Sequence, residues 1–237
     1  MAQKIGPIRE RITTLHTNSD SGKGPEAYGA GIPITPQEKF VKSVYFSLDD
    51  SIGCELNRLR NKEGIIPTCK LGCYHCCAQY ILTNIAEAQL LAQYVKREFS
   101  IKQIAYLRLR TLQWHKWEDI NQGRHRPAKM AEQAALSDAH PYCPMLVNGE
   151  CIIYPVRPVT CRTHFVYSNP QSCRPSYDPE YIATDPLALT SVVTVTNPLL
   201  QKIRDRIENA GMDFSHSIML LPQWLAIKMG WDLAVSL

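Results

Sequence analysis

The chain of 237 residues lacks long hydrophobic runs. Its most apolar late stretch, residues 218–235, is interrupted by proline, glutamine, lysine and aspartate, whereas a membrane span needs about 20 mainly apolar residues. The first residues run into the charged stretch 9–11 without the apolar segment of a secretory leader. We therefore expect a cytoplasmic protein that has no membrane partner.

Strong charge and nucleotide-binding motifs are also missing. The 26 basic and 22 acidic residues leave a net charge of only +4, which does not strongly support a nucleic-acid partner. No glycine motif of the nucleotide-binding kind is recognisable, and no catalytic constellation stands outside the cysteines. A protein partner or protein substrate stays open.

What the sequence does have is cysteine. Eight of the nine cysteines fall in two segments, 69–77 and 143–173, and they are Cys69, Cys73, Cys76, Cys77, Cys143, Cys151, Cys161 and Cys173. The ninth, Cys54, is expected on the polar side of a helix and outside any site. Free thiols at this density oxidise unless something occupies them. In a reducing compartment, clustered cysteines favour bound metal over disulfides.

The spacing within the first segment suits soft metal ions. Cys73 and Cys76 are separated by two residues, which lets both sulfurs point into one tight turn, and Cys69 precedes Cys73 at a slightly longer spacing. Adjacent side chains such as those of Cys76 and Cys77 diverge, so a polynuclear cluster or two nearby sites fits them better than one zinc ion does. The cofactor expected is therefore an iron–sulfur cluster or zinc.

The eight cysteines can be divided in more than one way. Two four-thiolate sites would use all of them, either one site per segment or mixed sets drawn from both segments. His75 and His164 are alternative ligands. Arg157, Arg162 and Arg174 flank the later cysteines and are candidates to offset thiolate charge.

Hydrophobic periodicity predicts a mainly α-helical protein. Thr35, Pro36 and Glu38 form a capping-box start for a helix that runs to about residue 59. Further helices are expected from a Thr83 or Asn84 cap to about residue 99, and over 101–121, 127–137, 197–211 and 222–229. Residues 191–196 fit either strand or helix. We expect an irregular arm over 1–34 and one helical cysteine-cluster domain over 35–237, with the cysteine segments between the helices.

A small β-hairpin is expected inside the second cysteine segment. Asn148-Gly149 is a preferred two-residue turn, which would pair Val147 with Glu150 and Leu146 with Cys151. Either Cys143 precedes this strand and turns inward, or Cys143 and Cys151 serve different sites.

These motifs together resemble the YkgJ family, whose members are described as zinc- or iron-chelating cysteine-cluster proteins. The resemblance covers roughly residues 69–173. It rests on the first cysteine segment, on Thr83 with Glu87, and then on Cys143-Pro144, Cys151-Ile152-Ile153-Tyr154, Arg157-Pro158 and Cys161-Arg162. This chain has three residues between its first two cysteines, where the family often has two. The flagellin lysine methylase, which carries an iron–sulfur cluster, has a similar cysteine pattern. The resemblance implies metal binding.

Three functions compete at this point. The first is an iron–sulfur protein for redox or protein-modification chemistry, and the second is a zinc-stabilised module that contacts protein or nucleic acid. The third is an enzyme similar to the lysine methylase. A nucleophilic pair of Cys161 with His164 is conceivable, but metal explains more of the residues.

Overall fold

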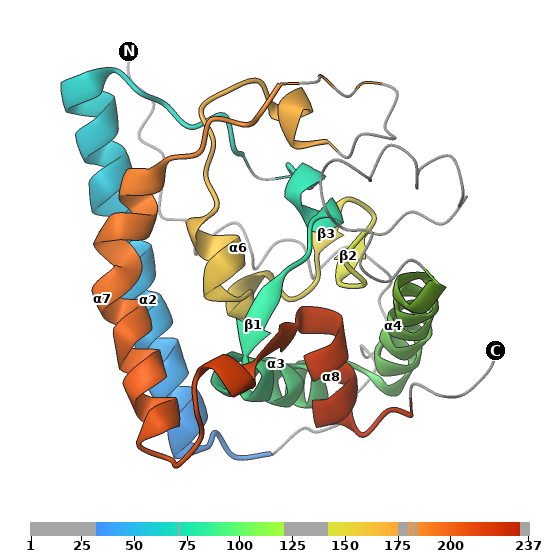
Figure 1. The fold of residues 1–237 in the computed structure, drawn as a ribbon. Helices are drawn as coiled ribbons and strands as arrows, with labels where there is room; N and C mark the ends of the chain where they lie inside the picture. Colours follow the sequence, from blue (N-terminus) through green and yellow to red (C-terminus); the bar gives the residue numbers. More distant parts are fainter. Residues whose placement is uncertain are drawn as a thin grey trace, which may run out of the picture.

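The computed structural model describes residues 32–70, 72–120, 142–174, 180, 182 and 184–232. There the chain is mainly helical, as the sequence predicts (Figure 1). The helices are α2 (Pro36–Arg58), α3 (Ile85–Glu98), α4 (Ile101–Ile120), α6 (Val159–Thr163), α7 (Thr190–Glu208) and α8 (Leu221–Met229). The strands are β1 (Leu82–Asn84), β2 (Leu146–Val147), β3 (Glu150–Cys151) and β4 (Ile218–Leu220). Most of the predicted arm and the whole predicted helix at 127–137 lie outside the described residues.

Helix α2 begins at its predicted capping box. Glu38 N donates to Thr35 Oγ1 at 3.2 Å, and Thr35 N donates to Glu38 Oε2 at 2.9 Å. Both amides would otherwise have no partner inside the helix. Of the predicted apolar stripe, Leu56 is half-buried and the other members, Val41, Tyr45, Leu48, Ile52 and Leu59, are buried.

The starts of α3 and α4 also follow from their capping residues. Asn84 Oδ1 accepts hydrogen bonds from Ala86 N and Glu87 N, both at 3.1 Å, so Asn84 rather than Thr83 is the cap of α3. Ser100 opens α4 as predicted, because Ser100 N donates to the Gln103 side chain at 2.8 Å. The predicted last helix corresponds to α8.

Helix α7 begins earlier than the sequence predicts. Its first residue is Thr190, and Pro198, the predicted start, lies inside the helix. Residues 191–196 are therefore helical. Proline removes one backbone donor from a helix interior, but Pro198 is exposed, where water can bond the carbonyl that loses its partner. Burial of Val192 and Thr196 favours the earlier start.

The main core lies between the long helices. Helices α2 and α7 run side by side, and α3 packs near α8 (Figure 1). Leu48, Leu90, Leu91, Ile203 and Leu225 from these helices are at most 1% exposed. Each such side chain contributes about 1.5–3 kcal/mol relative to an exposed one. Cys143 belongs to the same core cluster, so the second cysteine segment is packed against it.

Two short antiparallel strand pairs complete the described structure. Strands β2 and β3 form the predicted hairpin in the predicted register, with Leu146 opposite Cys151. The pairing of β1 with β4 was not predicted; it places Leu82 opposite Leu220. This pair fixes the chain where it leaves the first cysteine segment.

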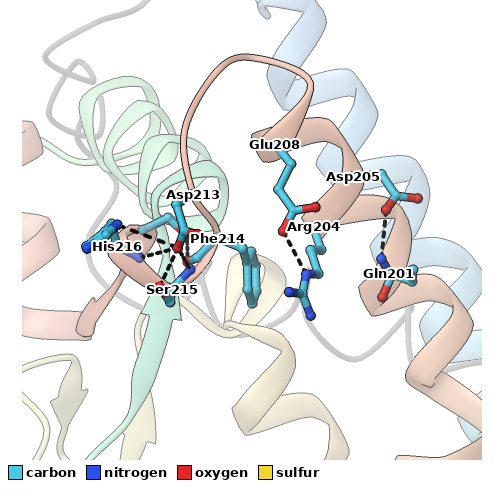
Figure 2. Close-up of polar contacts among 9 residues, drawn as sticks. Gln201, Arg204, Asp205, Glu208, Asp213, Phe214, Ser215 and His216 are labelled. Atoms are coloured by element: carbon cyan, nitrogen blue, oxygen red, sulfur yellow. Dashed lines mark hydrogen bonds and ion pairs between the residues drawn. The ribbon is translucent and has the colours of Figure 1, made fainter.

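The turn between α7 and β4 is held by one carboxylate. Asp213 Oδ1 accepts hydrogen bonds from Ser215 N at 2.7 Å and from His216 N at 3.3 Å (Figure 2). The same figure shows Arg204 Nε donating to Glu208 at 2.8 Å along the exposed side of α7. The turn directs the chain into β4. Among the described helices, none has both the length and the apolar content that a bilayer crossing requires.

Candidate metal centre

All nine cysteines lie in the described residues, and all are free thiols. Cys54 is exposed on α2, opposite the buried stripe of that helix. The other eight are half-buried or buried.

The first cysteine segment is folded by tight turns. Cys73 N and Cys77 N each donate to the carbonyl three residues earlier, at 3.0 and 2.8 Å. Gly72 has a φ of +85°, a left-handed conformation that other residues rarely adopt. Cys76 and Cys77 lie in the 3-10 turn η3 (His75–Ala78). The prediction that the cysteines lie between helices is therefore wrong for these two residues.

Cys69 is held against the second segment. Val166 N donates to Cys69 Sγ at 3.3 Å, and Thr68 N donates to Val166 O at 2.9 Å. An amide that donates to sulfur favours the thiolate form. Burial nevertheless leaves the pKa of Cys69 raised, and the charges of Cys73 and Cys76 add to that rise.

Cys173 reaches the same region from the 3-10 turn η5 (Pro170–Cys173), which contacts η3. Burial raises the pKa of Cys173 to about 11, and the charges of Cys69, Cys73 and Cys76 contribute. These four cysteines are therefore electrostatic neighbours.

Cys77 and Cys143 are joined directly through the backbone. Cys143 N donates to Cys77 O at 2.7 Å, and Leu146 N donates back to Cys143 O at 3.0 Å. Of the two predicted alternatives, Cys143 therefore precedes the strand and turns inward. Burial raises the pKa of Cys143 to about 12, and the charge of Cys151 adds to the rise.

Cys161 lies in α6, not between helices as the sequence predicts. Burial raises the pKa of Cys161, and the charges of Cys143, Cys151 and Cys76 raise it further.

Glu87 joins this short helix to α3. Its carboxylate accepts hydrogen bonds from Val159 N and Tyr45 Oη at 2.7 Å, from Asn84 Nδ2 at 2.7 Å and from Thr83 Oγ1 at 3.0 Å. Burial raises the pKa of Glu87, and these donors oppose the rise. The sequence pattern singles out Thr83 with Glu87, and the structure gives Glu87 a positioning role.

The charge of Cys76 acts on two groups of cysteines. The hydrogen bond from Cys77 lowers the pKa of Cys76 against the effect of burial, and the Arg157 charge acts in the same direction. The same bond raises the pKa of Cys77. The charge of Cys76 contributes to the raised pKa values in both groups, those of Cys69 and Cys173 on one side and of Cys143, Cys151 and Cys161 on the other.

Arginines bring positive charge to the thiols. Burial raises the pKa of Cys151, and the guanidinium of Arg157 opposes that rise. Arg110 of α4, which the sequence analysis missed, donates to Pro144 O at 2.9 Å and to Leu146 O at 2.7 Å. Its charge opposes the rise in the pKa of Cys143. No local motif marks Arg110, because it lies far from the cysteines along the chain.

The other two predicted arginines also form ion pairs. Arg162 donates to both carboxylate oxygens of Asp49, at 2.9 and 2.8 Å, and lies over the ring of Tyr45. Its charge also opposes the rise in the pKa of Cys151. Arg174 forms an ion pair with Glu180 at 2.6 Å.

The two histidines next to the cysteines differ in setting. His75 lies in η3 with its ring 5.3 Å from that of Tyr74. Burial lowers the pKa of His164, which favours the neutral imidazole. In the described part of the chain no hydrogen bond joins His164 to Cys161, and the raised pKa of Cys161 disfavours a nucleophilic thiolate.

The donor set fits a soft metal. Eight thiols, an amide that donates to sulfur and nearby arginines suit thiolate ligation, which carries negative charge. In the described ranges, no three cysteine, histidine or acidic side chains already stand as metal ligands. Cys143 Sγ instead donates to Met145 Sδ at 3.3 Å, as a protonated thiol does. Ligation would require the cysteine side chains to rotate.

The chain was also compared with known proteins. No family model, curated protein or solved structure matches it. The resemblance to the YkgJ family therefore stays a prediction from the motifs.

Proposed function

We propose that this protein binds metal through its eight clustered cysteines, and that the metal is an iron–sulfur cluster used in redox or protein-modification chemistry. The observation that supports the proposal is that backbone hydrogen bonds join the two distant cysteine segments, whose eight thiols are buried or half-buried, while Cys54 stays on the surface. Packing alone gives no reason for thiols to collect in this way.

Residues of this chain have distinct parts in such a centre. The eight thiols would lose their protons and ligate the metal, and Val166 N would bond the Cys69 sulfur. Arg157 and Arg110 would offset thiolate charge. When bound, an iron–sulfur cluster exchanges single electrons at a potential set by hydrogen bonds to sulfur, net charge and exposure.

An iron–sulfur cluster is preferred because the gathered ligands are all thiols and because Cys76 and Cys77 are adjacent. Zinc in a structural module that binds a protein partner is the second candidate. The observation that favours zinc is the scarcity of regular structure around the cysteines, where the hairpin strands have two residues each. A structural zinc ion supplies folding free energy to such segments.

Metal analysis of anaerobically purified protein tests the proposal. A brown protein whose broad visible absorption bleaches with reductant supports iron–sulfur, and a colourless protein with about two zinc ions per chain supports the zinc module. The variant C54S should keep the full metal content. Absence of both metals, with all nine thiols freely titratable, would contradict metal binding.

An activity similar to that of the flagellin lysine methylase needs its own assay. Cluster-replete protein should transfer a methyl group to a protein lysine if that hypothesis holds. Failure with such material would argue against it and leave metal binding intact.

A further inference from the structure

We infer that the eight cysteines form two separate four-thiolate metal sites, each of which takes ligands from both segments. Site one consists of Cys69, Cys73, Cys76 and Cys173, and site two consists of Cys77, Cys143, Cys151 and Cys161. The inference rests on the proposed function and adds the division of the ligands, which the sequence leaves open.

Backbone contacts define site one independently of charge. The hydrogen bonds of Thr68 N and Cys69 Sγ with Val166 hold the start of the first segment against the second. The contact of η5 with η3 then brings Cys173 to the turn that follows Cys73. The ligands of site one thus come from two loops and a turn, and a tetrahedral site takes ligands from several directions.

Site two lies against the core. Cys143 is bonded to Cys77 through the backbone, and the hairpin brings Cys151 to Leu146, whose amide bonds Cys143. Cys77, Cys143 and Cys151 all pack in the main core cluster. We assign Cys161 to the same set because α6 follows the hairpin closely along the chain and is held in place by Glu87.

The boundary between the sites is the peptide that joins Cys76 to Cys77. In a 3-10 turn, neighbouring Cα–Cβ bonds point about 120° apart, so the two side chains start in different directions. Two residues separate Cys73 from Cys76, a spacing that lets both thiolates bind one metal ion. The backbone carbonyl of Cys77 instead accepts a hydrogen bond from Cys143 N. On loading, each thiol gives its proton to solvent and each thiolate forms a bond to metal, which removes the hydrogen bond between Cys76 and Cys77.

Double variants of the full chain with the same number of substitutions test this division. The variant C69S/C173S removes two ligands from site one, and C151S/C161S removes two from site two. The variant C161S/C173S removes one ligand from each site. Anaerobic titration with Co²⁺ counts tightly bound equivalents from the thiolate-to-cobalt absorption, with C54S as the control.

Two tight equivalents are expected for the wild type and C54S, and one for each variant altered in a single site. The variant altered in both sites should lose both tight equivalents. Equal loss in all three double variants would overturn the division, because it would indicate one shared centre. A wild type that binds no cobalt would instead overturn the proposed function itself.

A measurement on the wild type avoids the risk that a variant fails to fold. Protein loaded with one equivalent of Co²⁺ is alkylated, and the protected cysteines are identified by mass spectrometry. Protection of one predicted set of four supports the division, with Cys76 and Cys77 in different sets. Protection of Cys76 and Cys77 together, or of sets confined to one segment, contradicts it.

Discussion

At the scale of single residues, Glu87 is a buried carboxylate that accepts four hydrogen bonds from three parts of the chain. Two of its donors, Tyr45 Oη and Val159 N, belong to α2 and α6, so the carboxylate fixes both helices to the start of α3. Replacing a buried acceptor of this kind with a group that also donates lowers the stability of the fold.

The variant E87Q should therefore lower the free energy of unfolding by about 1–3 kcal/mol, because the new amide faces donors that lose their acceptor. Urea denaturation of the metal-free protein measures this change. E98Q, the same substitution at an exposed position of α3, is the control and should be within about 0.5 kcal/mol of the wild type. Equal stability of E87Q and E98Q would contradict the positioning role.

At the scale of elements, the hairpin turn depends on a glycine. Gly149 has a φ of +80°, and a Cβ added there would meet only ordinary contacts at 3.9 Å with the Tyr74 ring. G149A should therefore lower the free energy of unfolding by about 1–2 kcal/mol, because alanine is strained in this left-handed conformation. Gly53, inside α2 with open space around it, is the matched control, and G53A should stabilise by about 0.5–1 kcal/mol. In urea denaturation, G149A should lower the free energy of unfolding and G53A should raise it.

The ion pair between α2 and α3 should make stability depend on pH. Burial raises the pKa of Glu38, but hydrogen bonds from Arg97 and Thr35 outweigh it and leave the pKa below its ordinary value of 4.5. The charged form thus adds stability above that value, and the contribution is lost as the pH falls through the lowered pKa.

E38Q should accordingly be less stable than the wild type at neutral pH, and the difference should shrink as the pH falls below 4.5. Denaturation across this pH range measures the effect. R97Q should reproduce the change, and the double variant should add little to either single variant. A difference that stays constant with pH would contradict the role of the pair.

Elements with local signals were predicted well from the sequence. The capping box at Thr35, the cap at Asn84 and the Asn148-Gly149 turn act over a few residues, and the structure confirms all three. The start of α7 was wrong, because burial of Val192 outweighs the local preference of Pro198. The pairing of β1 with β4 has no local signal, since its two strands are short and distant in sequence.

At the scale of the whole molecule, removal of metal should weaken the fold locally. The cysteine segments contain only short turns, one hairpin and the short helix α6, whereas the long helices have their own apolar core. A chelator should therefore lower the thermal midpoint of metal-loaded protein and increase amide exchange mainly at 69–77 and 143–173. Far-UV circular dichroism should change little, and a broad loss of helix would contradict this picture.

The site was only partly predictable at this scale. The two cysteine segments and their approach to one another follow from composition and spacing. The proposed division of the ligands does not, because it rests on contacts such as Cys143 N to Cys77 O and Val166 N to Cys69 Sγ. Arg110 was missed for the same reason.

The pairing of β1 with β4 also bears on how the protein is made. Chains leave the ribosome from the N-terminus, so the first cysteine segment is synthesised long before the strand that fixes its exit. During that interval its thiols are exposed to oxidants and to any metal ion in the cell. Under the proposed function, we therefore expect selective metal loading only after β4 has been made, and protection of the nascent segment until then.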